Sequence, residues 1–273
     1  MTLLRATSSE LTKQFTTAIW WVLAIVLAAY VGLTAAGLAA VIGAAASGVL
    51  VGADASASEL GSGGTALLYS LANSVGYVFP LLIGALLVTG EFRHKTLTPT
   101  FLAIPRRGTV LGGKIIAGAV MGLIYGAVSV VVTVAGVAGL LALFRVDPEL
   151  DSSDTWAMLG RILIASVLWV LVGIGTGLLV RNQVAAIVIV LAFTQFVEPL
   201  LRVGGSFVSQ LSEVAKYLPG SAADALVGSS IYTSMSATSG AALEWWAGGL
   251  VLAAYAVVLL LAGHIFSWRR DVA

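Results

Sequence analysis

Long runs of apolar residues without charge divide this 273-residue chain into six segments, each near the length of a membrane-spanning helix. A helix needs about 20 mostly apolar residues to cross the hydrocarbon, because every backbone polar group must be satisfied within the segment. We therefore expect an all-α polytopic membrane protein that forms a single transmembrane domain over residues 1–273. The pattern predicts spans at about 17–42, 67–90, 115–144, 157–180, 184–201 and 245–268.

The first 16 residues follow a different pattern. On a helix, Leu4, Leu11 and Phe15 would share one face while Ser8 and Lys13 fall elsewhere, which favours an interfacial helix that lies on the membrane surface. A frayed polar tail is the alternative. The apolar run that follows is longer than the roughly 7–15 residues of a signal-peptide core, so we expect no cleavage there.

The charges between the spans predict the orientation. With the N-terminus in the cytoplasm, ten of the 14 Lys and Arg residues would lie on the cytoplasmic side of the membrane. Because Lys and Arg concentrate in cytoplasmic loops, the sequence predicts that both termini are cytoplasmic.

Composition excludes several other classes of protein. Only 10% of the residues are charged, whereas a soluble domain carries roughly 25%. The absence of cysteine excludes disulfide scaffolds and thiolate metal sites. Two histidines far apart in the sequence, His94 and His264, leave little for a histidine-built metal site.

One glycine-rich stretch resembles a phosphate-binding loop but lacks its essential parts. Residues 108–114 fit GxxxxGK, yet Ile115 stands where a Ser or Thr hydroxyl must hold Mg²⁺, and no strand precedes the stretch. We expect no ATPase in this chain. Three glycines of the third span share one helix stripe and predict close helix packing instead: Gly118, Gly122 and Gly126.

Few polar side chains lie within the spans. Asn73 and Tyr77 lie one turn apart in the second span, and Glu198 is the one ionisable candidate, near the outer end of the fifth. Arg161 and Arg202 are expected at the same, outer side of the membrane as Glu198. A structural ion pair with one of them is therefore an equally good interpretation of Glu198. No nucleophile with a base and no metal cluster is visible in the spans, so we expect that the chain is not an enzyme by itself.

Two loops exceed what a helix hairpin needs, 91–114 inside and 202–244 outside. The outer loop is partly apolar, which predicts a re-entrant segment; a loop packed on the helix ends is the alternative. In the inner loop, Phe101, Leu102 and Ile104 would lie on a short helix and be available to a cytoplasmic partner. The alternative is that the basic flank of this loop binds anionic lipid.

The inner loop resembles that of the ABC type-2 permeases of bacterial exporters. In that family an acidic residue ends the second span and a Gly- or Lys-Thr pair follows. A Leu-x-x-Pro-x-Arg stretch and a lysine then precede the third span. His94-Lys95 here stands where His-Gly is frequent. The matching residues are Glu91, Lys95, Thr96, Leu102, Pro105, Arg107 and Lys114.

The resemblance implies an export permease in the bacterial cytoplasmic membrane. Two chains would pair, as a homodimer, and each would dock a separate nucleotide-binding ATPase that holds ATP and Mg²⁺, while this chain binds no cofactor. The lipid bilayer would be the other partner, and we expect no nucleic acid. The loop would serve as the coupling helix through Glu91, Arg93, His94, Thr96, Phe101, Leu102, Pro105, Arg106, Arg107 and Lys114.

By the same analogy, spans two and five of both chains would line a central path. The spans offer mostly Ala, Val, Leu, Ile and Gly, so we expect an amphipathic or apolar cargo such as a drug, antibiotic, peptide or lipid. An ATP-independent secondary carrier or channel is the alternative function, and a membrane-embedded assembly or sensor protein is a third. The candidates to line the path are Asn73, Tyr77, Phe79, Phe193, Gln195 and Phe196.

Overall fold

The computed structural model describes residues 2–48, 61–104, 106–205, 209–230 and 243–268 of the chain. In these ranges every regular element is a helix, and six helical segments are long and apolar enough to cross a membrane. This confirms the predicted all-α membrane fold with six candidate spans. Pro105 and parts of the predicted outer loop, at 206–208 and 231–242, lie outside the described residues.

Five of the six candidate spans extend beyond the predicted ranges at one end or both, whereas the sixth ends two residues before the predicted 268. Three of the six combine shorter elements: the second joins α3 to α4, the fifth joins α8, η2 and α9, and the sixth joins α13 to the start of η3. The spans are Ile19–Ala46, Gly64–His94, Arg107–Leu143, Ser153–Val180, Gln183–Gly205 and Trp245–Phe266. The elements are α1 (Leu3–Thr16), α2 (Ile19–Ala46), α3 (Gly61–Ser74), α4 (Val78–His94), α5 (Leu97–Ala103), α6 (Arg107–Leu143), α7 (Ser153–Val180), α8 (Gln183–Ala192), η2 (Phe193–Val197), α9 (Glu198–Gly205), α10 (Ser209–Ala215), α11 (Pro219–Val227), α13 (Trp245–Gly263) and η3 (His264–Trp268).

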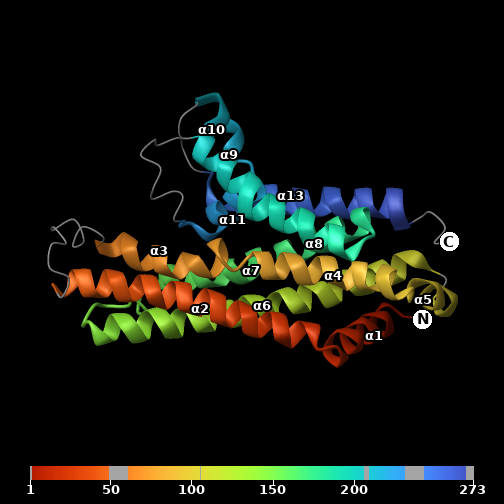
Figure 1. Ribbon diagram of the computed structural model, residues 1–273, viewed down its shortest axis with the longest axis horizontal. Helices are drawn as coiled ribbons and strands as arrows, with labels where there is room; N and C mark the ends of the chain where they lie inside the picture. Colours follow the sequence, from red (N-terminus) through yellow and green to blue (C-terminus); the bar gives the residue numbers. More distant parts are fainter. Residues whose placement is uncertain (1, 49–60, 105, 206–208, 231–242, 269–273) are drawn as a thin grey trace.

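The long helices run side by side along the longest axis of the molecule (Figure 1). Helix α7 packs against α4, α6 and α13, and α2 packs on the outside against α6. Helices α1 and α5 lie at one end of this bundle, which we call the α5 end, and α3 lies toward the other (Figure 1). Helices α9 and α10 project from the side of the bundle, whereas α11 lies beneath them against α13.

Small residues set the spacing of the central helices. A Cβ at Gly122 of α6 would lie 2.7 Å from the Cα of Val167 in α7, and a Cβ at Gly173 of α7 would overlap the Leu81 carbonyl of α4. Gly118 and Gly126 face α7 as well. Because packing rather than the hydrophobic effect drives association in lipid, such close backbone contacts hold the α4–α7–α6 layer together.

Helix α6 begins at Arg107 rather than at 115, where the third span was expected to start. The expected span was the charge-free run that begins directly after Lys114, because a charge is costly at membrane depth. In the structure Lys114 is fully buried and paired with two carboxylates, so its charge does not interrupt the helix.

Candidate functional site

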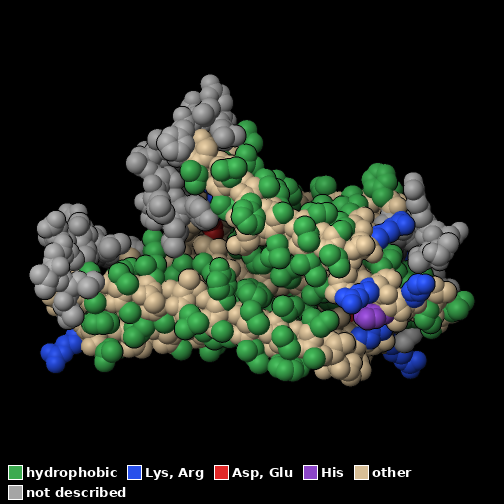
Figure 2. Space-filling view, in the orientation of Figure 1, with side chains coloured by type: hydrophobic (Ala, Val, Ile, Leu, Met, Phe, Trp, Pro, Cys, Tyr) green, Lys and Arg blue, Asp and Glu red, His purple; other side chains and the backbone are tan. Residues whose placement is uncertain are grey.

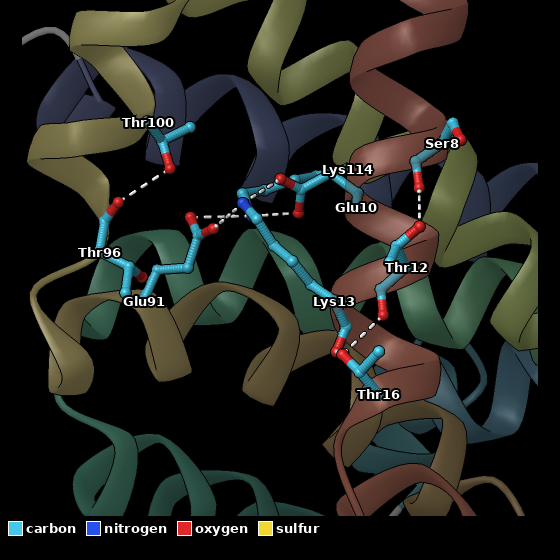
Figure 3. Close-up of polar contacts among 9 residues, drawn as sticks. All are labelled: Ser8, Glu10, Thr12, Lys13, Thr16, Glu91, Thr96, Thr100 and Lys114. Carbon is cyan, nitrogen blue, oxygen red and sulfur yellow. Dashed lines mark hydrogen bonds and ion pairs between the residues drawn. The ribbon is translucent and has the colours of Figure 1, made fainter.

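Four charged side chains from three separate helices meet at the α5 end of the bundle (Figure 3). Glu10 and Lys13 come from α1, Glu91 from the last turn of α4, and Lys114 from α6. We call this group the α1 ion cluster. It joins parts of the chain that are far apart in sequence.

The four side chains of the α1 ion cluster form a closed ring in which cations and anions alternate. Lys114 Nζ lies 2.6 Å from Glu10 Oε2 and 2.8 Å from Glu91 Oε2, the latter an ion pair outside hydrogen-bond geometry. Lys13 Nζ donates to Glu10 Oε1 at 2.8 Å and to Glu91 Oε1 at 2.9 Å. Each carboxylate therefore contacts both lysines, one through each oxygen.

Burial makes this ring sensitive to its charge balance. The Lys114 side chain is 0% exposed, whereas the Lys13 side chain is 39% exposed. Burial acts to lower the pKa of Lys13, but its hydrogen bonds to Glu10 and Glu91 outweigh that effect and raise this pKa above the ordinary 10.5. Two cations and two anions cancel, so the buried ring has no net charge.

The ring lies directly at the root of α5. After Glu91, helix α4 ends at His94, and the next residue, Lys95, adopts the left-handed conformation with φ 54°. The Thr96 amide donates to the Glu91 carbonyl at 3.1 Å, which closes the turn, and α5 starts at Leu97. Leu97 and Ile104 are buried in one apolar cluster with Ala6 of α1, so α5 is fixed at both of its ends.

The outward face of α5 and its flanks is basic with one large apolar side chain. Arg93, His94 and Arg106 are exposed, and Leu102 is 79% exposed. Figure 2 shows Lys, Arg and His side chains gathered at this end of the molecule. The expectation that Ile104 would be available to a partner was wrong, because Ile104 packs inward as the chain returns to α6.

The remaining predicted loop residues take supporting positions. The Arg93 guanidinium donates to Gln183 Oε1 at the start of α8, at 3.3 Å. The Arg107 guanidinium lies 5.2 Å from the centroid of the partly buried Phe101 ring. Thr96 is exposed, and its carbonyl accepts from the Thr100 hydroxyl at 2.8 Å. These contacts tie α5 to α6 and α4 to α8.

A second buried group of charges lies away from the α5 end, where α9 meets α11. It consists of Glu198, Arg202 and Asp224, and we call it the α11 ion cluster. Arg202 Nη2 lies 2.8 Å from Glu198 Oε1, and Arg202 Nη1 lies 2.7 Å from Asp224 Oδ2. Asn73 of α3 donates to Asp224 Oδ1 at 3.1 Å. The ion-pair interpretation of Glu198 holds for Arg202, whereas Arg161 lies at the other end of α11 and donates to the Val227 carbonyl.

Next to this cluster, an irregular point in the second span meets one in the fifth. Between α3 and α4, Tyr77 stacks on Trp169 of α7 with ring centroids 4.6 Å apart. The Tyr77 hydroxyl donates to the Thr194 carbonyl at 3.0 Å, inside the π-helical segment η2. Single π-turns within helices are frequent at functional positions.

The six residues predicted to line a path lie in different surroundings. Asn73 and Phe79 are buried, Tyr77 and Phe193 are partly buried, and Gln195 and Phe196 face outward from η2. The structure brings Tyr77 next to η2, the segment that contains Phe193, Gln195 and Phe196. Their role in a path stays a prediction.

Sequence reasoning missed three members of the two clusters as site residues: Glu10, Lys13 and Asp224. Glu10 and Lys13 are three residues apart on a predicted helix, a spacing that brings opposite charges together. Asp224 is the one acidic residue between 214 and 243. A lone acid in a partly apolar stretch is a signal that could have identified it.

Models of known protein families and curated protein sequences were both compared with this chain, and neither comparison found a match.

Proposed function

We propose that this chain is the transmembrane permease subunit of an ATP-driven exporter, with α5 as the coupling helix on which a separate nucleotide-binding ATPase docks. The observation that carries this proposal is the closed charge ring that joins α1, α4 and α6 at the root of α5. In this proposal two copies pair in the bacterial cytoplasmic membrane, with both termini on the cytoplasmic side.

In this proposal, a force on α5 reaches the bundle through three helices, α4, α6 and α1. The turn at Lys95 and Thr96 leads directly into α4. The carboxylate of Glu91 then pulls on Lys114 of α6 and on Lys13 of α1, because both lysines bind it within 2.9 Å. Since buried ion pairs are lost only at high cost, the three helices move as one body.

The exposed face of α5 is suited to a protein partner with acidic and apolar groups. Arg93, Arg106 and His94 can attract such a partner and orient it, and Leu102 supplies an apolar side chain for a pocket. A helix only seven residues long needs no such exposed Leu for folding. This favours a protein partner over lipid head groups, which need only the basic residues.

As part of the same proposal, the exported compound is amphipathic or apolar. The spans present mostly apolar side chains to their surroundings, such as Val131, Leu250 and Phe196, which are more than half exposed in the single chain. Such surfaces suit an amphipathic or apolar compound, for example a drug, antibiotic, peptide or lipid.

A matched pair of charge reversals tests the docking role. Arg106 lies beside α5 and Arg145 at the opposite end of α6, and both are exposed. The proposal predicts that a nucleotide-binding protein is encoded next to the gene of this chain. The two proteins would be purified together, and the ATPase activity of the complex measured. We expect Arg106→Glu to lower recovery of the complex about tenfold, which corresponds to about 1.4 kcal/mol, and Arg145→Glu to leave it unchanged.

Two outcomes contradict the proposal. Equal recovery for Arg106→Glu, for Leu102→Asp and for the control would remove α5 as the docking site. Uphill transport by the isolated chain in liposomes, with no nucleotide-hydrolysing protein present, would favour the alternative of an ATP-independent carrier.

A further inference from the structure

One carboxylate oxygen of the α11 ion cluster has no hydrogen-bond donor. Glu198 Oε1 accepts three hydrogen bonds, from Arg202 Nε at 3.2 Å, Arg202 Nη2 at 2.8 Å and the Ser221 amide at 3.1 Å. Glu198 Oε2 is buried and has no hydrogen-bond partner in the part of the chain that the structure describes. The Glu198 side chain is 1% exposed, so this oxygen is shielded from bulk water.

Asp224 in the same cluster shows how a buried ionised carboxylate is normally satisfied. Its Oδ1 accepts from Asn73 Nδ2 and the Ser74 hydroxyl, both at 3.1 Å. Its Oδ2 accepts from the Ser230 hydroxyl and from Arg202 Nη1, both at 2.7 Å. Four donors on two oxygens stabilise a negative charge on Asp224. The same structure therefore distinguishes the two carboxyl groups.

The charges in this cluster do not balance if both carboxyl groups are ionised. Arg202 contributes one positive charge against two negative charges, which leaves a net charge of −1 in a buried place. An uncompensated buried ion is strongly unfavourable, and a carboxylate in that situation takes up a proton instead.

Charged groups on the surrounding elements do not supply the missing positive charge. On α10, Glu213 pairs with Lys216, which begins the link to α11. Arg161 of α7 lies over the Trp245 ring at 5.2 Å and donates to the Val227 carbonyl at the far end of α11. From the second span, the titratable Tyr77 hydroxyl donates to the Thr194 carbonyl. The charged partners of Glu198 on the described elements are thus Arg202 and Asp224.

We infer that Glu198 is a proton-binding site, with the proton on Oε2 at neutral pH while Asp224 remains ionised and pairs with Arg202. The proton makes the cluster neutral and needs no added space, and Oε1 remains the acceptor of all three N–H groups. When α9 separates from α11 and water enters, the O–H bond of Glu198 breaks, its electron pair stays on Oε2, and the proton passes to water. This inference does not depend on the proposed ATPase.

Infrared spectroscopy of the protein in lipid nanodiscs at neutral pH tests the site directly. A protonated carboxyl group has a C=O stretching band that an ionised carboxylate lacks. We expect this band in the wild-type spectrum, shifted in protein labelled with ¹³C-carboxyl glutamate and unshifted in protein labelled with ¹³C-carboxyl aspartate. The labelling needs no substitution, so the result does not depend on whether a variant folds.

Two variants complete the assignment. Glu198→Gln should remove the band, whereas Glu213→Gln, which changes an exposed glutamate of α10, should retain it. The inference is overturned if the wild-type protein shows no such band, if the aspartate label shifts it, or if it persists in Glu198→Gln. None of these results bears on whether an ATPase docks at α5.

Discussion

The two buried ion clusters are built from the same kinds of side chain but differ in their charge balance. The α1 ion cluster has two lysines and two glutamates, and each carboxylate contacts both cations. The α11 ion cluster has one arginine for two carboxylates, and one oxygen of Glu198 has no hydrogen-bond donor within the described ranges. A balanced buried ring resists any change of charge, whereas an unbalanced cluster accommodates the loss of one negative charge.

The two clusters also differ in what they connect. The α1 ion cluster joins α1, α4 and α6, and it has one partly exposed member, Lys13. The α11 ion cluster joins α9, α11 and the end of α3 through Asn73 and Ser74. In the two proposals, the first cluster would hold its helices together during transport, and the second would change its protonation state when α9 and α11 separate.

The largest effect is expected from removing the fully buried cation. Lys114→Met leaves Glu10 and Glu91 facing each other with Lys13 as their remaining cation. Because breaking a buried pair leaves an uncompensated charge, we expect a loss of about 3–5 kcal/mol in the free energy of unfolding. SDS titration in mixed micelles measures this quantity. Lys216→Met, at a pair with an exposed glutamate, is the control and should change it by less than about 0.5 kcal/mol.

The same substitution in both clusters tests their contrast most sharply. Glu10→Gln leaves two lysines with one carboxylate, and we expect it to cost roughly 2–3 kcal/mol. Glu198→Gln replaces a carboxyl that we infer to be protonated with a neutral amide of similar shape, so we expect a change below about 1 kcal/mol. The measurement is again the free energy of unfolding. Equal losses in the two variants would show that the clusters do not differ in charge balance.

The sequence predicts the spans well because lipid favours apolar side chains at nearly every position of a membrane-spanning segment. Six charge-free runs thus led to six helices, and the short helix after Glu91 was expected close to where α5 lies. Helix α6 starts at Arg107, before the predicted third span, because Lys114 is paired and does not interrupt the helix. Its partner Glu10 is distant in sequence, and no local pattern reveals such a pairing.

The candidate sites were harder to predict for the same reason. Glu91 and Lys114 were selected from the resemblance of the loop, but the ring needs Glu10 and Lys13, whose part in it depends on how α1 packs. Asp224 pairs with Arg202 only because α11 folds back under α9. Pairings of this kind depend on tertiary contacts between elements whose relative positions the hydropathy pattern does not determine.

A smaller and opposite effect is expected at the turn between the α1 ion cluster and α5. Lys95 has φ 54°, a conformation that glycine adopts without strain. We expect Lys95→Gly to stabilise the protein by about 0.5–1 kcal/mol without changing the ring. Lys95→Ala, which keeps the unfavourable conformation, is the control and should not stabilise it. Stabilisation by alanine as well as glycine would instead point to the charge of Lys95.

The smallest effect is expected on the stability that Lys13, the partly exposed member of the ring, contributes at high pH. Burial lowers the pKa of Lys13, but the hydrogen bonds to Glu10 and Glu91 raise it overall above 10.5. A lysine whose pKa is higher in the folded state contributes stability that is complete below its unfolded pKa and is lost as pH rises through the folded value. We therefore expect the stability difference between wild type and Lys13→Met to shrink as pH rises above 10.5. Thermal unfolding of both proteins across that range measures it. A difference that stays constant would mean that Lys13 contributes packing rather than charge, and that the ring is closed electrostatically by Lys114 alone.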